Sequence, residues 1–422
     1  MLHEVFWQIF ANWWWILLPF VFRKPFLYLY RFWRMELWDA TIPKVFLEVK
    51  IPKDVMKPIK AMEHVFAGFH SIHDVITWRE KWIEGQFQLR FALEIVSTGG
   101  EIHFYIRVPA RFRDIIESNI YSQYPEAEIS EVQDYTLGIP PDIPNKDWEL
   151  WGTDIVNTQP DPYPIKTYAM FESEVQPMEE KRIDPLAGLL EGMSLLKPGE
   201  HLWVQIVVKP IRDEDKDWVG QGHEIRDKLA RRPEKPKKKP MVQEAVELWL
   251  PGWTPEGAAP AEKDKEVIPP EMKLTPGERD ILAGIEEKIT KWGFDCNIRY
   301  LYLAKRDVYF GPRARIPYGF FKEVSLENLG GFKPQKNTMT KVKSPLFWFL
   351  DKRRLYIRKR RIFRYYQKRW TPYFPRGGDV YVLNSEELAT LFHFPGRITA
   401  PAGGLPRIEA KKGQALPELP IE

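Results

Sequence analysis

The histidines nearest one another in the sequence are the first candidates for metal binding or acid–base chemistry. His64, His70 and His73 fall close together, and the last two, three positions apart, can share one face of a helix. A metal site needs a further ligand in a matching place, and the sequence offers none. Glu94 and His103 can meet across a hairpin, but a lone surface pair is a weak catalytic candidate. The sequence therefore predicts no catalytic residue, no metal ligand and no cofactor, and we expect a protein that is not an enzyme.

Motifs that hold nucleotides or activate nucleophiles are missing from the sequence. A phosphate-binding loop has the pattern GxxxxGK[ST], in which backbone amides surround the phosphates and the lysine reaches the terminal ones. The Gly-Gly pairs that begin at positions 99, 330, 377 and 403 lack the lysine and hydroxyl residue that should follow, and they indicate turns. The patterns GxSxG and HExxH are also absent.

The most informative polar feature is a basic and aromatic segment at residues 345–370, PLFWFLDKRRLYIRKRRIFRYYQKRW, which we expect to be a helix. Anionic lipid attracts such a segment by about 1 kcal/mol per basic residue, with Phe347, Trp348 and Phe349 as interfacial anchors. The phosphates of DNA or RNA attract it as well, and its aromatic rings can stack on bases. A third interpretation is a solvated helix whose charges pair with acidic patches elsewhere on the chain. Lipid is the favoured partner, and the candidate binding residues are Lys352, Arg353, Arg354, Arg358, Lys359, Arg360, Arg361, Arg364, Lys368 and Arg369.

A run of uncharged residues from Val5 to Phe22, VFWQIFANWWWILLPFVF, predicts a membrane anchor. At about 1.5 Å per residue, a helix of this length reaches roughly 27 Å, just enough for a hydrocarbon core of about 30 Å. Basic residues follow the run rather than precede it, so the bulk of the chain is expected in the cytoplasm and a cleaved signal peptide is disfavoured. The residues expected in the bilayer are Phe6, Trp7, Trp13, Trp14, Trp15, Ile16, Leu17, Leu18 and Phe20.

The anchor region is extended by residues 25–38, PFLYLYRFWRMELW, so that it covers residues 1–38. Aromatic residues alternate with arginines here, which suits a segment lying along the headgroups with its arginines reaching water. The alternative is that both segments are buried helices or an amphipathic hairpin in the membrane plane, because the run is short and contains Pro19. The expected location is the cell membrane, single-pass or peripheral, with membrane lipids as partners.

The composition indicates a folded chain in a reducing compartment. Of the 422 residues, 44% are apolar and 28% are charged, and the net charge is only +4, so the total charge does not indicate nucleic acid. The single cysteine, Cys296, cannot form an internal disulfide or build a thiolate metal site by itself. After the anchor, we expect an α+β protein made of tandem ferredoxin-like domains.

Residues 45–136 are predicted to form the first ferredoxin-like domain, with the element order βαββαβ. The clearest part is a hairpin in which residues 88–96 and 101–108 alternate apolar and polar side chains on either side of the turn Ser97-Thr98-Gly99-Gly100. This fold hosts many unrelated activities, so it gives no function by itself. The other expected elements are strands at 45–51 and 127–132 and helices at 58–72 and 111–123.

Residues 137–164, rich in Pro, Asp and Trp, are expected to connect the first domain to a second, less regular ferredoxin-like domain at 165–398. An insert at 231–274 and a tail at 399–422 are rich in Pro with Lys, Glu or Gly, a composition typical of disorder. The predicted strands are 166–173, 201–211, 294–304 and 379–383, and the predicted helices are 185–196 and 276–292.

Several stretches of this chain resemble an uncharacterised family of candidate-phylum bacteria that is found in or beside type IV secretion-like ATPases of the conjugation type. The stretches are AMEHVFAGFHSI (61–72), LEIVSTGGEIHFYIR (93–107), IESNIYSQYPEAEI (116–129), YPIKTYAMFE (163–172) and LNSEELATLFHFPG (383–396). The resemblance covers most of residues 45–420, and longer relatives continue into a DNA-pumping motor domain.

The resemblance implies a non-catalytic accessory component of a transfer machine that acts with a separate P-loop ATPase, and DNA is a further candidate partner. It transfers no functional residue to this chain. The alternative function is a membrane-associated protein that binds nucleic acid through residues 351–370.

Overall fold

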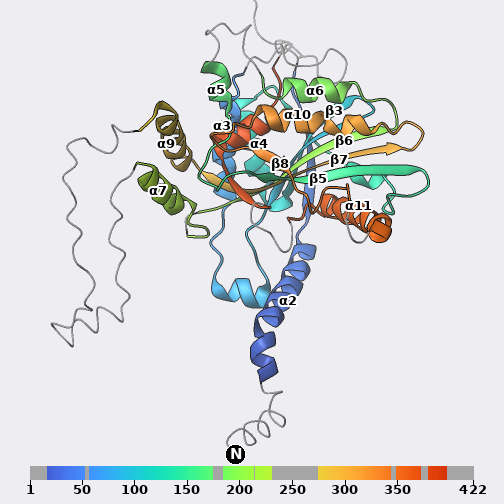
Figure 1. The fold of residues 1–422 in the computed structure, drawn as a ribbon, viewed down its shortest axis with the longest axis horizontal. Coiled ribbons are helices and arrows are strands. Elements are labelled where there is room, and N and C mark those ends of the chain that lie inside the picture. The colour runs from blue at the N-terminus through green and yellow to red at the C-terminus, as the bar shows by residue number, and fades with distance from the viewer. Residues whose placement is uncertain are drawn as a thin grey trace, which may run out of the picture.

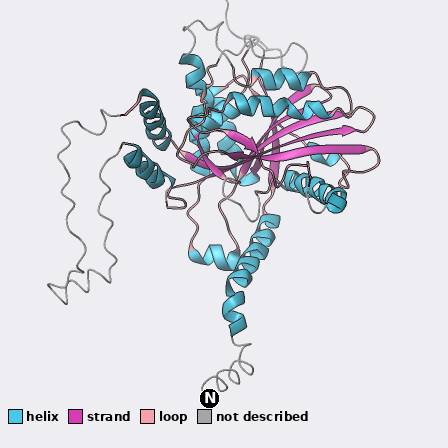
Figure 2. Cartoon of the chain, in the orientation of Figure 1, coloured by secondary structure: helices cyan, strands magenta, loops and turns pink. Residues whose placement is uncertain are grey.

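One antiparallel sheet runs through both halves of the chain and contains every strand that the structure describes (Figure 2). The structure is a computed structural model, and it describes residues 17–52, 57–173, 184–212, 214–230, 274–343, 348–371 and 379–396. In these residues the sheet has nine strands in the order β4-β1-β3-β2-β6-β7-β5-β8, and β9 pairs with β7 beside this path. The fold is therefore mixed α+β, as the sequence predicts.

The first half of the sheet has the element order that the sequence predicts for residues 45–136. The hairpin has the expected register, with Ile95 opposite Phe104. Its turn contains Gly100 at a φ of 98°, where an added Cβ would lie 2.8 Å from the carbonyl oxygen of Ser194, so glycine is required. The elements are β1 (Lys44–Lys50), α3 (Lys60–Phe69), β2 (Phe91–Thr98), β3 (Glu101–Pro109), α4 (Arg113–Gln123) and β4 (Glu128–Glu131).

The second half extends the same sheet, because β6 pairs with β2 and places Val204 opposite Ile95. The strands predicted at 201–211 and 294–304 are confirmed as β6 and β7, and the helices predicted at 185–196 and 276–292 as α6 and α9. The elements are β5 (Trp148–Asn157), α5 (Tyr168–Ser173), α6 (Ala187–Ser194), β6 (Glu200–Pro210), α7 (Trp218–Leu229), α9 (Pro276–Ile289), β7 (Gly293–Lys305), α10 (Ile316–Glu323), β8 (Phe332–Pro334), α11 (Asp351–Lys368), β9 (Tyr381–Asn384) and α12 (Ser385–Leu391).

Strand β5 lies within residues 137–164, so the prediction that this segment is only a connection is wrong. Two features hide the strand in the sequence. Gly152 occurs in the middle of β5 because an added Cβ would lie 2.3 Å from a methyl group of Leu301. Asp154 is buried and accepts a hydrogen bond from Arg299 at 3.1 Å, so an acidic residue occupies a buried position.

Residues 166–173 contain helix α5 instead of the predicted strand. Tyr168 and Phe171 are both buried and are three residues apart, a spacing that places them on one side of a helix. The backbone N–H of Tyr168 is satisfied by the hydroxyl of Thr390 at 3.0 Å rather than by a neighbouring strand. The strand predicted at 379–383 is confirmed as β9, which pairs with β7, whereas β8 was not predicted from the sequence.

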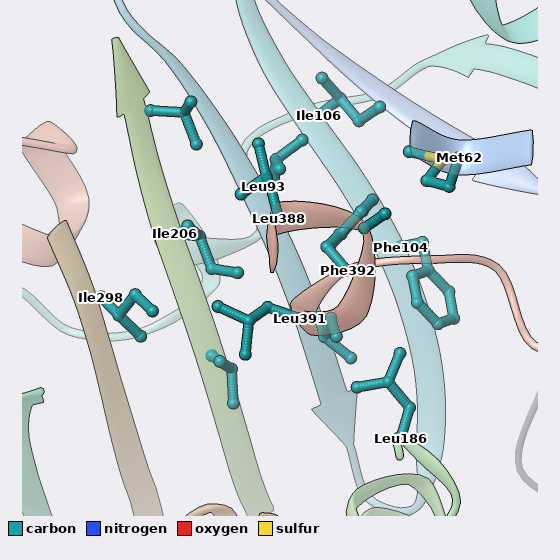
Figure 3. Close-up of a cluster of buried hydrophobic side chains, with 14 of the residues drawn as sticks. Met62, Leu93, Phe104, Ile106, Leu186, Ile206, Ile298, Leu388, Leu391 and Phe392 are labelled. Atoms are coloured by element: carbon teal, nitrogen blue, oxygen red, sulfur yellow. The ribbon is translucent and has the colours of Figure 1, made fainter. Parts of the chain in front are cut away.

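The sheet separates two hydrophobic layers. Helices α6 and α10 lie over one face, and α11 lies against the other (Figure 1). The larger layer lies on the side of α6 and α10. It contains buried side chains from β1, β2, β3, β6 and β7. Figure 3 shows that Leu388, Leu391 and Phe392, from α12 and the residue after it, lie between Phe104 of the first half and Ile298 of the second. Helix α12 therefore helps to hold the two halves together.

Several predicted segments lie outside the described residues. They include most of the insert predicted at 231–274, of which only Leu274 is described, and the whole tail predicted at 399–422. Residues 1–16, with Phe6, Trp7, Trp13, Trp14, Trp15 and Ile16 of the predicted anchor, are also outside them. Leu17, Leu18 and Phe20 begin helix α2 (Leu17–Thr41), which is one continuous helix through the segment predicted to lie along the headgroups.

Candidate lipid- or nucleic-acid-binding surface

The basic segment forms helix α11, and its apolar residues pack it onto the sheet. Ile362, Phe363 and Tyr366 are buried. Trp203 of β6 contacts two of these side chains, with ring centroids 6.5 Å from that of Phe363 and 5.4 Å from that of Tyr366. Because these residues repeat at three- and four-residue spacing, the remaining positions of the helix project outward.

Six of the ten basic residues predicted to bind lipid or nucleic acid are exposed on the outer side of α11. Others are partly buried and contact the protein itself. The Lys359 ammonium lies 2.5 Å from a carboxylate oxygen of Glu149. Arg358 donates hydrogen bonds to two backbone carbonyls, and Arg360 donates one to the Tyr356 hydroxyl at 2.8 Å. The six exposed residues, here called the basic face, are Lys352, Arg353, Arg354, Arg361, Arg364 and Lys368.

The tenth predicted residue, Arg369, lies inside the protein. Its side chain is 1% exposed, and its guanidinium donates hydrogen bonds to both carboxylate oxygens of Glu94, at 2.9 and 3.1 Å, and to Asp134. Burial acts to lower the pKa of Arg369, but the attraction of Glu94 outweighs it and raises the pKa. A guanidinium enclosed in this way cannot reach a membrane or a nucleic acid, so the prediction that Arg369 binds either one is wrong.

The cluster around Arg369 fixes the end of α11 to the centre of the sheet. Glu94 also accepts hydrogen bonds from the Tyr135 hydroxyl at 2.8 Å and from the Gln205 amide at 2.7 Å. The Tyr135 and Tyr366 hydroxyl oxygens lie 2.7 Å apart. Burial raises the pKa of Tyr135, so this phenol stays protonated and can donate to the carboxylate.

Helix α2 projects from the body (Figure 1). It carries an exposed apolar stripe. The side chains of the stripe are between 45% and 66% exposed. They recur at three- and four-residue spacing and therefore lie on one side of the helix, whereas the lysine and arginines of α2 lie on its other sides. The stripe, here called the outer stripe of α2, consists of Phe22, Phe26, Leu29, Trp33 and Leu37.

A side of α2 next to the outer stripe rests on the body near the end of α11. Phe32 contacts Trp370 edge to face, with ring centroids 5.7 Å apart. A carboxylate oxygen of Glu36 lies 3.5 Å from the ammonium of Lys368 in α11. The outer stripe and the basic face therefore belong to helices that contact each other. Both helices lie on the side of the sheet away from α6 and α10 (Figure 1).

A turn that follows α3 adds exposed apolar residues beside α2. This turn, η3 (Glu80–Glu84), is attached to α2 by a hydrogen bond from Arg34 to the carbonyl of Ile83. Val75 and Trp78 before it are 70% and 71% exposed, and Ile83 is 50% exposed. Sequence reasoning missed these residues, although two tryptophans four positions apart in WREKWIE were an available signal.

The histidines considered for metal binding have separate partners. The Nε2 atom of His70 lies 2.9 Å from the carbonyl oxygen of Ile211, and Nε2 of His73 lies 2.7 Å from a carboxylate oxygen of Asp215. His64 is exposed. Across the described part of the chain, no group of three or more His, Cys, Asp or Glu side chains could hold a metal ion.

Glu94 and His103, considered as a cross-strand pair, are not partners. Glu94 is opposite Tyr105 in the hairpin, and its carboxylate binds Arg369 instead. His103 has its Nδ1 atom 2.6 Å from a carboxylate oxygen of Glu48 in β1. The hydrogen bond from His103 lowers the pKa of Glu48 despite its burial.

Among the helices of the described residues, none has both the length and the apolar character needed to cross a membrane. Helix α2 is long enough, with 25 residues, but Arg23, Lys24, Arg31 and Arg34 interrupt its apolar residues. The predicted span of residues 5–22 overlaps α2 only at residues 17–22.

Comparison with models of known protein families finds no match, and comparison with curated proteins finds none either. The function of this chain must therefore be inferred from its residues and their geometry.

Proposed function

We propose that this protein is a non-catalytic accessory module that binds the cytoplasmic surface of the cell membrane through α2 and α11 and presents its body to a partner protein. The observation that carries the proposal is the outer stripe of α2, in which five large apolar side chains are exposed on one side of a helix with basic residues on its other sides. A helix divided in this way lies in the membrane interface, with its apolar side against the acyl chains and its cations near the headgroups.

The basic face of α11 favours a bilayer that contains anionic lipid. Each lysine or arginine near such a surface contributes about 1 kcal/mol of attraction. Trp348 and Phe349, which precede α11, are 74% and 64% exposed and supply aromatic anchors beside the charge. Anionic lipids are concentrated in the cytoplasmic leaflet, which agrees with the basic residues that follow the N-terminal apolar run.

We further infer that the sheet consists of two ferredoxin-like units. In the first unit, the strand order β4-β1-β3-β2 with antiparallel neighbours suits the βαββαβ motif. The second unit has the order β8-β5-β7-β6, which is the same when its strands are matched in chain order. The edge strands β2 and β6 pair and join the units. This fold provides no activity by itself, so function belongs to the surfaces it carries.

The partner that we propose is a separate P-loop ATPase of a conjugation-type or type IV secretion-like machine. Support comes from the resemblance of most of residues 45–420 to a family found in or beside such ATPases. With α2 and α11 at the bilayer, the opposite side of the sheet, where α6 and α10 lie, points away from it (Figure 1). That side is then open to a protein in the cytoplasm.

Affinity purification of the full-length protein from its native membranes in mild detergent tests the partner. We expect mass spectrometry to identify a P-loop ATPase that is absent from a purification without the tagged protein. Recovery of nucleic acid and no motor protein would contradict this proposal. It would favour the alternative function, in which residues 351–370 bind DNA or RNA.

Removing the outer stripe is expected to release the protein from membranes. In the variant Phe22→Ser, Phe26→Ser, Leu29→Ser and Trp33→Ser, four large side chains no longer enter the acyl region, and each contributes about 1.5–3 kcal/mol when fully buried. Even if these side chains are only partly inserted in the wild type, the variant should bind the membrane more than a hundredfold more weakly. The measurement is co-flotation of the full-length protein with vesicles that contain anionic lipid.

A matched control replaces exposed apolar residues elsewhere on the body. Leu137, Leu195, Trp292 and Phe310 are between 56% and 76% exposed and lie outside α2, η3 and α11. Their combined replacement by serine should leave flotation unchanged. If the two variants floated equally well, the outer stripe would have no role in membrane binding.

A further inference from the structure

Two adjoining hollows of about 230 and 560 Å³ lie between α2, the loop that carries η3 and one end of the sheet. Both are lined by Arg31 and Met35 of α2, by Phe87 and Arg90 before β2, and by Thr371 after α11. Small-molecule pockets commonly measure about 300–1,000 Å³, so the space suits a small organic molecule. The outer stripe of α2 does not line either hollow.

Arg90 lines both hollows and forms no ion pair with a carboxylate of the described residues. Its guanidinium donates one long hydrogen bond, 3.4 Å to the Thr371 hydroxyl, and lies 5.0 Å from the centre of the Phe87 ring. Burial lowers the pKa of Arg90 to about 10; Asp39 opposes this change, and the positive charges of Arg107 and Arg299 add to it. A bound anion would relieve the repulsion between these cations.

Arg31 is the second cation common to both hollows. Its guanidinium lies 5.7 Å from the centre of the Trp82 ring, and its Nε atom is buried without a hydrogen-bond partner. It forms no ion pair with a carboxylate of the described residues. A buried donor of this kind is costly unless it binds an acceptor, and an anion in the hollows would supply one.

The acidic residues that line the hollows already have side-chain partners other than Arg31 and Arg90. Asp39 lies 2.6 Å from the Lys44 ammonium, and Asp295 lies 2.9 Å from that of Lys209. Among the described residues that line the hollows, Arg31 and Arg90 therefore form no ion pair with these carboxylates. The other pairs are Glu36 with Lys368, Asp74 with Arg111, and Asp215 with His73.

We propose that Arg31 and Arg90 bind the phosphate group of an ester whose organic part is apolar or aromatic. Guanidinium groups present paired N–H donors that match phosphate oxygens. In the smaller hollow, Phe32, Met35 and Trp370 provide apolar surface for the organic part. A lipid headgroup and a soluble phosphate ester share this chemistry. The site does not depend on the proposed membrane role, because the outer stripe takes no part in it.

The test is calorimetric titration of the full-length protein with phenyl phosphate, a soluble ester that carries an aromatic group. We expect saturable binding to the wild type and at least tenfold weaker binding to R90Q and to R31Q. R90K keeps the charge but not the paired donors, so its affinity should lie between those of the wild type and R90Q. The control is R79Q, since Arg79 is exposed and lines neither hollow, and it should bind like the wild type. Thermal unfolding checks that each variant is folded.

A second titration, with vesicles containing phosphatidic acid, distinguishes the source of the phosphate. If only the vesicles bind, and R90Q weakens that binding tenfold while R79Q does not, the ligand is a lipid headgroup. Equal binding of both probes to the wild type, R90Q and R31Q would overturn the proposal, and so would the failure of both probes to bind the wild type. The outer-stripe variant should keep its affinity for phenyl phosphate, so failure of the membrane proposal would be seen separately.

Discussion

Replacing Arg369 by methionine is expected to lower the free energy of unfolding by about 3–5 kcal/mol, the range measured when one partner of a buried ion pair is removed. Glu94 is fully buried and would lose the two hydrogen bonds that Arg369 donates to it. The measurement is equilibrium unfolding in urea, followed by intrinsic fluorescence and by circular dichroism to check that both report one transition.

Two further variants separate this effect from a general effect on α11. Arg361 lies on the basic face, and Arg361→Gln should change the unfolding free energy by no more than about 0.5 kcal/mol. Adding Glu94→Leu to Arg369→Met removes the buried carboxyl group that has lost its partner and should recover part of the lost stability. If Arg369→Met were as stable as Arg361→Gln, the buried cluster would not hold α11 in place.

The same cluster makes stability depend on acid. Burial acts to raise the pKa of Asp134, but the hydrogen bond and charge of Arg369 outweigh it, so the pKa lies below its usual value of 3.8. The folded state then binds this proton less readily than the unfolded chain. The stability that Asp134 contributes is present above pH about 4 and is lost as the pH falls through the lowered pKa. Arg369→Met should show less of this dependence.

The sequence predicted strands correctly where apolar and polar residues alternate without interruption. In the hairpin of β2 and β3, and in β6 and β7, apolar residues alternate along the chain and so gather on one face of the sheet. The strands predicted there are confirmed. Strand β5 was missed because Gly152 and Asp154 interrupt the pattern. Gly152 packs against Leu301 and Asp154 accepts a hydrogen bond from Arg299, and both partners are distant in the sequence. The pairing of β2 with β6 was not predicted, because backbone hydrogen bonding between edge strands leaves little trace in residue types.

The candidate surface was predictable in part for a similar reason. A dense basic segment indicates a helix with charged positions, and its inner residues can be recognised by their spacing. The burial of Arg369 could not be recognised from the sequence, because its partners Glu94 and Asp134 lie 275 and 235 residues away in the chain. The same limit applies to Arg31 and Arg90, which come together only because α2 packs beside the end of the sheet.

Replacing the basic face of α11 by glutamine is expected to weaken binding to anionic vesicles by about three to four orders of magnitude. The variant changes Lys352, Arg353, Arg354, Arg361, Arg364 and Lys368, all exposed, and each cation contributes about 1 kcal/mol near an anionic surface. Fold stability should be nearly unchanged, because Ile362, Phe363 and Tyr366 still pack on the sheet. Vesicle co-sedimentation across a range of anionic lipid contents measures the loss.

A control with the same change in charge places six glutamines elsewhere, at Lys197, Lys228, Arg279, Arg315, Lys322 and Lys333, which are all exposed and lie outside α2 and α11. If location matters, this control should keep most of the vesicle affinity, whereas an effect of net charge alone would weaken both variants equally. Duplex DNA is titrated in parallel over a range of salt concentrations, because phosphate contacts on DNA give a steep salt dependence. Loss of DNA affinity with unchanged vesicle binding in the basic-face variant would assign α11 to nucleic acid and leave α2 as the membrane contact.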